Sequence, residues 1–323
     1  MTTYFLRRVL IAIPTLIAIS FVIFALLSLA PGDPMAQFAT NPEVPAVVRE
    51  QMRTSLGLDQ PWPIRYWKWL ILLPQGQWGW SFAARMPVLE FIWQRLPQTL
   101  AVVGVAYILS ILIAIPVGVY TAARPKSWFS YVVSVVSMAG ISLPTFLSGT
   151  ILLLIFSVLL QNTPFRLPMI YDTQLKVTDF ESLVTQIKQS AMPVIVLSLF
   201  NAGAMTRFVR SAMLENLPLD YVRTARAKGL VERTVILKHT LRNSLIPVVT
   251  LVALGAPGVF AGAIITEQIF RVNGIGDLLI TSIGRSDTPV VMAIVFIFAI
   301  LVVLCSLVAD VCYGLLDPRI KLG

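Results

Sequence analysis

Few residues in this 323-residue chain are of types that perform catalysis or hold a metal. His239 is the only histidine, which excludes a histidine-rich metal site. Cys305 and Cys312 lie seven residues apart on one face of a predicted helix with no other ligands nearby, so we interpret them as packed thiols. Phosphate-loop, H-E-x-x-H and G-x-S-x-G motifs are absent. We therefore expect no enzyme, no ATP site and no cofactor or metal in this chain.

Two acidic residues, Glu267 and Asp310, stand at the ends of long apolar stretches. A proton relay in a carrier needs acids deep within a membrane span, where burial of a charge is costly. A carboxylate at the end of such a stretch more simply caps a helix or extends to the membrane interface. These positions argue against a proton-coupled carrier.

The densest charged segment runs from Asp220 to Pro247 and reads DYVRTARAKGLVERTVILKHTLRNSLIP. Asp220 is placed to cap a helix over Tyr221 to Lys228, because its side chain can accept from free backbone N–H groups. Gly229 suits the left-handed residue that follows a helix. A second helix is predicted to start near Val231 and to continue into the next apolar stretch.

This basic helix hairpin has two interpretations. Arg223, Arg226 and Lys228 can pair with acidic residues in a groove of a soluble partner, and the small residues between them allow close approach. Alternatively, eight basic residues beside a bilayer attract anionic lipid, at about 1 kcal/mol each. The composition of the segment does not decide between these two roles.

The elements that must position these residues are predicted to be membrane-spanning helices. Hydrophobic residues make up 57% of the chain and charged residues 13%, and the mean hydropathy is +0.81. A soluble domain carries about 25% charged residues. Disorder and a disulfide scaffold are excluded by the same composition. We expect an all-α integral membrane protein.

Six windows of at least 18 residues lack Asp, Glu, Lys and Arg, and each is long enough to cross a bilayer. The windows are residues 9–32, 96–123, 127–165, 189–206, 243–266 and 288–309. We interpret the third as one span with a kink at Pro144 that continues into an apolar loop. The first exceeds the core of a signal peptide, so we expect a retained helix.

Basic residues predict the orientation of these six spans. With Glu267 and Asp310 at the ends of spans left out, the side that holds both termini carries 14 basic and four acidic residues, against 11 and ten on the other side. The positive-inside rule places both termini in the cytoplasm. This divides the chain into a cytoplasmic N-terminus (1–8), a first span (9–32), an extracytoplasmic segment (33–95) and a five-span core (96–323) with a cytoplasmic loop (207–242). Trp62, Trp67, Trp69, Trp78 and Trp80 are typical of an interfacial belt.

Asp220–Leu230 and Leu241–Pro247 resemble the cytoplasmic loop of ABC importer permeases, specifically the B-type permeases of the dipeptide/oligopeptide/nickel group. Of the general signature E-A-A-x3-G-x9-I-x-L-P, Ala225, Gly229 and Leu241 fall in register. The departures from it are Arg223, Thr224, His239 and Arg242. The resemblance continues in 7–8, 31–34, 56–61, 95–100, 267–270, 274–276 and 316–319, and it is looser in 77–81 and 284–289.

The resemblance implies a type I importer fold with a coupling helix that docks on an ATPase subunit. The implied coupling residues are Asp220, Tyr221, Arg223, Thr224, Ala225, Arg226, Ala227, Lys228, Gly229, Leu230 and Leu241. The implied partners are a second permease, two ATPase subunits that bind ATP and magnesium, and an extracytoplasmic binding protein. No nucleic acid is expected. The implied solute is a di- or oligopeptide, with nickel, glutathione or another small solute as alternatives, in a bacterial or archaeal plasma membrane.

Polar residues on the middle spans are candidates for the solute pathway, although such residues often form helix–helix hydrogen bonds. They are Ser137, Ser142, Thr145, Ser148, Asn201 and Thr206. Two other readings of the whole chain stay open: a self-contained secondary carrier or channel, and a membrane scaffold whose basic loop binds lipid or protein.

Overall fold

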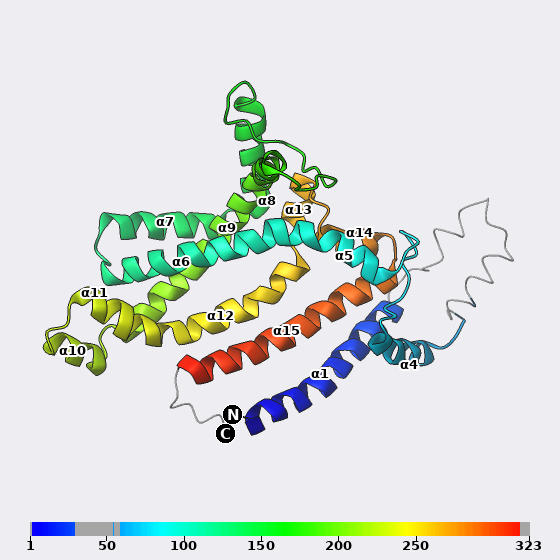
Figure 1. Cartoon of the computed structure of the whole chain (residues 1–323), viewed down its shortest axis with the longest axis horizontal. Helices are drawn as coiled ribbons and strands as arrows, with labels where there is room; N and C mark the ends of the chain where they lie inside the picture. Colours follow the sequence, from blue (N-terminus) through cyan, green and yellow to red (C-terminus); the bar gives the residue numbers. More distant parts are fainter. Residues whose placement is uncertain (1, 30–53, 55–58, 317–323) are drawn as a thin grey trace.

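A computed structural model describes residues 2–29, 54 and 59–316 of the chain, and within them the regular structure is helical (Figure 1). The α-helices are α1 (Thr2–Leu29), α4 (Trp62–Leu72), α5 (Val88–Thr99), α6 (Val105–Ala123), α7 (Trp128–Ser142), α8 (Thr145–Leu153), α9 (Phe180–Asn216), α10 (Asp220–Ala227), α11 (Glu232–Thr234), α12 (Leu241–Ala261), α13 (Ile264–Phe270), α14 (Ile275–Gly284) and α15 (Thr288–Leu316). A 3₁₀ turn, η1 (Leu73–Gln75), follows α4, and π-helical segments η2 (Leu100–Gly104), η3 (Leu154–Leu159) and η4 (Val235–Thr240) interrupt longer helices.

Five helical stretches are long and apolar enough to cross a membrane. They are Leu6–Leu29, Val88–Ala123, Phe180–Asn216, Glu232–Phe260 and Thr288–Cys312. Each overlaps one of the predicted windows. The helical runs extend beyond the charge-free windows, because polar residues continue several of them past the apolar stretch.

The third predicted window is more sharply broken than expected. Its two halves, Trp128–Ser142 and Thr145–Leu159, meet at 100°, so they form either one broken span or a re-entrant loop. The backbone of Leu143 is extended, as expected for a residue before proline, and Pro144 then starts α8. The predicted kink at Pro144 is therefore a full change of direction.

Helix boundaries also differ from the predicted divisions of the chain. Residues 2–8, predicted as the cytoplasmic N-terminus, belong to the same helix α1 as the first span. The predicted 33–95 segment ends inside α5, which continues through η2 into α6. The predicted turn at 31–34 and the motifs at residues 56–58 and 317–319 lie outside the described residues.

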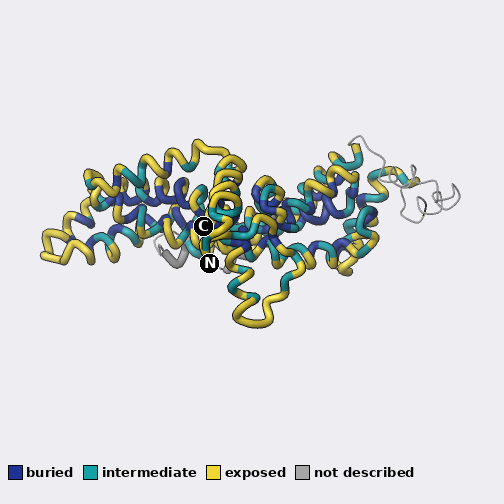
Figure 2. The backbone as a smooth tube through the Cα atoms, turned by 90° about the horizontal axis from the view of Figure 1, so that it is seen from above, coloured by how far each residue is buried: buried dark blue, intermediate teal, exposed yellow. Residues whose placement is uncertain are grey.

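The helices approach each other closely where small residues face them. A Cβ atom on Gly118 of α6 would lie 2.7 Å from the side chain of Val209 on α9. Gly203 of α9 similarly lies against the backbone of Ser137 on α7, where a Cβ would be 3.3 Å from the carbonyl oxygen. Figure 2 shows buried residues along the inside of the bundle and exposed residues on its outer surface. α6 and α9 therefore pack closely together; α7, α8 and α12 pack on α9, whereas α15 packs on α12 and α1 packs on α15.

The two ends of the bundle carry different elements. α10 and α11 lie at one end, and α4, α5, α13 and α14 lie at the opposite end (Figure 1). Near the α10 end, Arg8 of α1 pairs with Asp310 of α15, with Nε 3.4 Å from Oδ2. The sequence analysis placed Asp310 as a capping or interfacial residue, and its partner is this arginine.

Candidate functional site

The helix α10 begins one residue earlier than predicted. Leu219 is its N-cap residue and makes no side-chain capping bond. The prediction that Asp220 caps the helix is therefore wrong, because Asp220 is already the first helical residue. Its side chain is 97% exposed, and its carboxylate lies 3.6 Å from Arg223 Nη1. In the first turn the carboxylate still complements the helix dipole.

The turn that ends α10 confirms the prediction for Gly229. Its φ is +75°, and a Cβ there would have no atom within 4 Å. The N–H of Gly229 donates to Arg226 O at 2.9 Å, and the N–H of Leu230 donates to Ala225 O at 3.4 Å. This is the paired bonding of a Schellman turn, which satisfies carbonyls at the helix end. Lys228 occupies the C-cap position.

A small apolar core holds α10 against the start of the following helix. Val222 and Val235 are fully buried there, Ala225 is buried, and Tyr221 packs at the edge. The Tyr221 hydroxyl also donates to Asn216 Oδ1 at 2.9 Å. Ala225 therefore faces the protein, whereas Thr224, Ala227, Gly229 and Leu230 are exposed.

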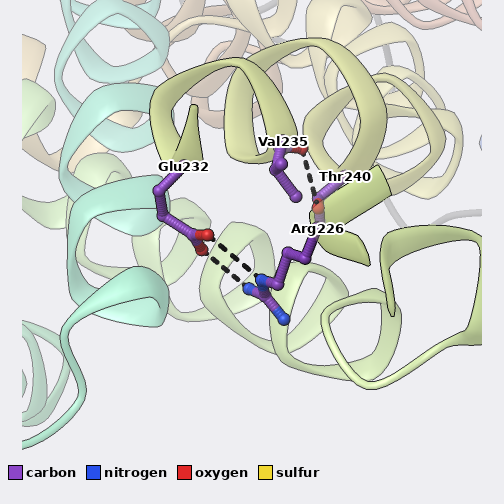
Figure 3. Close-up of polar contacts among 4 residues, drawn as sticks. All are labelled: Arg226, Glu232, Val235 and Thr240. Carbon is purple, nitrogen blue, oxygen red and sulfur yellow. Dashed lines mark hydrogen bonds and ion pairs between the residues drawn. The ribbon is translucent and has the colours of Figure 1, made fainter. Parts of the chain in front are cut away.

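An ion pair that the sequence analysis missed crosses the glycine turn. Arg226 donates through Nε to Glu232 Oε2 at 3.1 Å and through Nη2 to Glu232 Oε1 at 2.7 Å (Figure 3). This two-bond contact raises the pKa of the Arg226 guanidinium. Arg226 thus connects α10 to α11, and Arg223 and Lys228 are left as basic side chains without that constraint.

The helix continues without a break from α11 through η4 into the span α12. Val235–Thr240 is π-helical, and the Thr240 hydroxyl donates to Val235 O at 3.1 Å (Figure 3). α12 then continues from Leu241, which packs against a core that includes Val119 of α6 and Met213 of α9. The helical segment from Glu232 onward therefore connects the α10 turn to α12 and the core on which α12 packs.

The exposed surface around α10 is strongly basic. The exposed basic residues are Arg223, Arg226, Lys228, Arg233, Lys238 and Arg242. Asp220 and Glu232 are the exposed acids within 220–242, and Glu232 is already paired. Such a surface suits an acidic groove on another molecule.

The predicted pathway residues differ in burial. Ser137 and Thr206 are buried in contacts between α7 and α9 and between α6 and α9. Thr145, Ser148 and Asn201 are half-buried, and Ser142 is exposed with its hydroxyl donating to Met138 O at 2.9 Å. All six lie on α7, α8 and α9, and their role in a pathway stays a prediction.

Two buried carboxylates organise the end of the bundle opposite α10. Glu267 accepts from Thr99 Oγ1 at 3.2 Å and from the N–H of Asp277 at 2.8 Å, and it ties α5 and α14 to α13. Its pKa is raised by burial, which outweighs these hydrogen bonds. The closely packed Gly274 leaves space for this carboxylate. Glu267 thus acts as a cap, as one reading of the sequence expected.

Asp287 was not singled out in the sequence analysis. Its carboxylate accepts from Ser81 Oγ at 2.5 Å and from the N–H groups of Phe82 and Ala83 at 3.1 Å. It fastens the loop before α5 to the start of α15. Its partners are too distant in the chain for a local pattern to reveal them. Among the described residues no group of three His, Cys, Asp or Glu side chains is arranged to hold a metal.

Comparison with known proteins covers the whole chain. Residues 114–322 match the model of the family "Binding-protein-dependent transport system inner membrane component", and residues 1–103 match the N-terminal model of the same systems. The oligopeptide transport system permease protein AppB of Bacillus subtilis is 39% identical over 99% of this chain and 100% of its own length. The di/tripeptide transport system permease protein DppB of Pseudomonas aeruginosa is 38% identical over 99% of both chains.

A glutathione transport system permease protein, GsiC of Salmonella choleraesuis, is 36% identical over 99% of both chains. These relatives are named as permeases, and the family is a membrane component of transport systems. The chain is accordingly a multi-pass membrane permease subunit and not an enzyme. It belongs to the binding-protein-dependent transport system inner membrane component family.

Proposed function

We propose that this chain is a permease subunit of an ATP-driven importer for di- and oligopeptides, and that it forms half of the translocation pathway. The observation that carries the proposal is α10, a short basic helix exposed between two spans and held rigidly to α12. Similarity over the full length to permeases named for oligopeptides and di/tripeptides supports the solute class.

In this proposal α10 is the coupling helix and lies in the cytoplasm, as do both termini. Asp220–Leu230 docks in a cleft of an ATPase subunit, and Leu241 receives the movement at the start of α12. Arg223 and Lys228 meet acidic groups of that cleft, while Arg226 keeps α10 in position through Glu232. ATP and magnesium bind to the two partner ATPases and not to this chain.

The pathway is proposed to run between this chain and a second, related permease. Ser142, Thr145, Ser148 and Asn201 are available to solute in the present conformation, because none of them is fully buried. Ser137 and Thr206 join the pathway only when α9 separates from α7 and α6. An extracytoplasmic binding protein delivers the solute to the end opposite α10, where segment 33–95 contributes to the contact.

Glutathione is a second candidate solute, because a full-length relative is named for its transport. Glutathione is itself a tripeptide, so both solutes require a pathway for a small zwitterionic chain. The residues of this chain fit a peptide and glutathione equally well as the solute.

The test begins with the chain tagged in its native host and solubilised in a mild detergent. We expect two phosphate-loop ATPases and a second permease to co-purify in stoichiometric amounts. The complex in liposomes should then take up peptides only with ATP and the binding protein. A chain that purifies alone in several mild detergents and still moves solute would instead establish a self-contained carrier.

A further inference from the structure

We propose that α4 is an interfacial helix that lies parallel to the membrane plane within one leaflet. Its exposed apolar face then contacts lipid at the boundary of headgroups and acyl chains. The helix has 11 residues and is about 16 Å long, too short to cross a bilayer. Its inner face and its outer face are both apolar. The two faces therefore need different apolar neighbours.

The inner face of α4 is fastened to the first and last long helices. Tyr66 is buried, and its hydroxyl lies 3.0 Å from Ser20 Oγ and donates to Ile17 O at 3.2 Å. Trp69 packs on Phe24 at a centroid distance of 6.2 Å. These contacts fix the position of α4 relative to α1.

The contacts at the two ends of α4 show that it lies across the spans. Trp62, in its first turn, packs on Phe21 of α1 at 5.7 Å, and Trp69, in its last, packs on Phe296 of α15 at 5.5 Å. α4 thus extends from α1 to α15 and crosses these spans instead of running along either of them. That is the arrangement of a helix that lies along the membrane plane.

The depth agrees with an interfacial position. The aromatic contacts of α4 on α1 are made by Phe21 and Phe24, which lie between the middle of the apolar stretch Leu6–Leu29 and its C-terminal side. α4 therefore lies in one half of the span and not at its centre. Interfacial helices bury their apolar faces about 5–10 Å deep.

The charged edge of α4 points toward the end of α1. The guanidinium of Arg65 lies over the ring of Phe24 at 5.9 Å, whereas the Tyr66 hydroxyl reaches Ile17, two turns further into the span. Lys68 follows Arg65 by three residues, so both lie on the same edge. This edge faces the headgroups, where basic side chains meet lipid phosphates.

The outer face of α4 carries the apolar residues that remain uncovered. Ile64, Trp67 and Ile71 are 48%, 60% and 54% exposed, and their spacing places them on one side of the helix. The adjacent surface of α1 is also apolar, with Val22 and Leu26 exposed. Because the outer face of α4 continues the exposed apolar surface of a span, lipid is its proposed occupant. Tryptophan is enriched at this depth of the membrane.

The test measures what surrounds the outer face in the assembled complex in liposomes. Cys305 and Cys312 are replaced by alanine, and a nitroxide label is placed on Ile64→Cys, Trp67→Cys or Ile71→Cys. Power saturation with oxygen and with a water-soluble nickel chelate then gives the environment of each label. Leu26→Cys on α1 is the lipid control, and Lys176→Cys, on an exposed loop residue, is the water control.

We expect all three labels to show a several-fold higher ratio of oxygen to nickel accessibility than Lys176→Cys, comparable to that of Leu26→Cys. Nickel accessibility equal to that at Lys176→Cys would overturn the proposal, because the face would then be in water. Low accessibility to both reagents would also overturn it, because a protein subunit would then cover α4.

A second measurement needs no label. Lipids brominated near the headgroup should quench the tryptophan fluorescence of the wild-type complex more than lipids brominated at the chain ends, and Trp67→Phe should reduce that difference. Unchanged quenching in Trp67→Phe would count against lipid contact at this face.

The leaflet in which α4 lies rests on the topology in the proposed function, whereas lipid contact does not. A membrane-impermeant thiol reagent applied to intact cells should label Lys68→Cys. Labelling only after the membrane is opened would overturn the proposed topology and leave the lipid contact standing.

Discussion

At the α10 end of the molecule charged side chains lie on the surface, whereas at the opposite end Glu267 and Asp287 are buried. The exposed ion pair of Arg226 and Glu232 contributes little to the stability of the fold, because water solvates both groups when the pair opens. The buried carboxylates each satisfy donors that no water reaches. Charged residues at the α10 end are therefore available to bind a partner, whereas Glu267 and Asp287 at the opposite end stabilise the fold.

Replacing Asp287 by alanine should give the largest loss of stability. Ser81 Oγ and the N–H groups of Phe82 and Ala83 would lose their acceptor in a buried site. An unsatisfied buried donor costs about 1–3 kcal/mol, so we expect unfolding to become easier by about 3 kcal/mol or more. Thermal unfolding of the purified chain in detergent measures this change.

Asp220→Ala is the matched control at the other end. Its carboxylate is exposed and lies 3.6 Å from Arg223, so the loss should be about 0.5 kcal/mol or less. Equal destabilisation by the two alanine variants would contradict the contrast between the ends.

Gly229→Asp should reduce solute uptake by about tenfold or more, which corresponds to about 1.4 kcal/mol of lost docking energy. The aspartate would enter the exposed turn that ends the proposed coupling helix, where a Cβ meets no atom within 4 Å. Uptake by the complex in liposomes, measured beside its ATPase activity, reports the uncoupling.

Gly76→Asp introduces the same backbone strain at a position outside the proposed docking surface. Its φ is +78° against +75° at Gly229, and its Cβ would also have no neighbour within 4 Å. We expect this variant to keep the wild-type ratio of uptake to ATP hydrolysis, because it leaves the proposed docking surface unchanged. Normal uptake by Gly229→Asp would remove the coupling role from α10.

Exchanging the charges of the Arg226–Glu232 pair tests whether Arg226 holds α10 in position or contacts the ATPase directly. Arg226→Glu and Glu232→Arg each break an exposed pair worth about 1 kcal/mol or less, so each should lower uptake by about fivefold or less. The double variant restores the pair with reversed polarity. We expect it to recover uptake, and a failure to recover would mean that Arg226 contacts the ATPase directly.

The hairpin around α10 was largely predictable because its signals are local. The glycine after a run of helix formers predicted the left-handed turn at Gly229, and the apolar spacing predicted the following helix. Asp220 was misplaced by one residue, because a capping role depends on the backbone of Leu219 and the sequence does not reveal that conformation. Charge-free windows located the spans because length and composition alone decide what crosses a bilayer.

The rest depends on contacts between segments distant in the chain. The 100° break near Pro144 was predicted only as a kink, because proline marks the position of a bend and packing sets its size. The partners of Asp287 and the contact of Tyr66 with Ser20 join residues that no periodic pattern links. Such contacts become visible only when the helices have been placed.

The smallest expected effect is a dependence of stability on pH at Glu267. Burial, and to a lesser extent the charge of Asp277, raises the pKa of Glu267 above that of an unfolded chain, where it is about 4.3. The folded protein therefore binds this proton more tightly, and the contribution to stability is present below the unfolded pKa and lost as pH rises through the folded pKa.

Wild type should accordingly gain thermal stability relative to Glu267→Gln as the pH is lowered toward the unfolded pKa of about 4.3, because glutamine does not titrate. Asp179→Asn is the control at the same end. The pKa of Asp179 is lowered, first by the N–H of Ser182, so this residue stays ionised across the same range and its variant should show a constant difference from wild type. A gain for wild type as the pH rises would mean that Thr99 and the N–H of Asp277 hold Glu267 ionised. Glu267 would then be a permanent anion, and the end opposite α10 would carry its fixed negative charge beneath the surface.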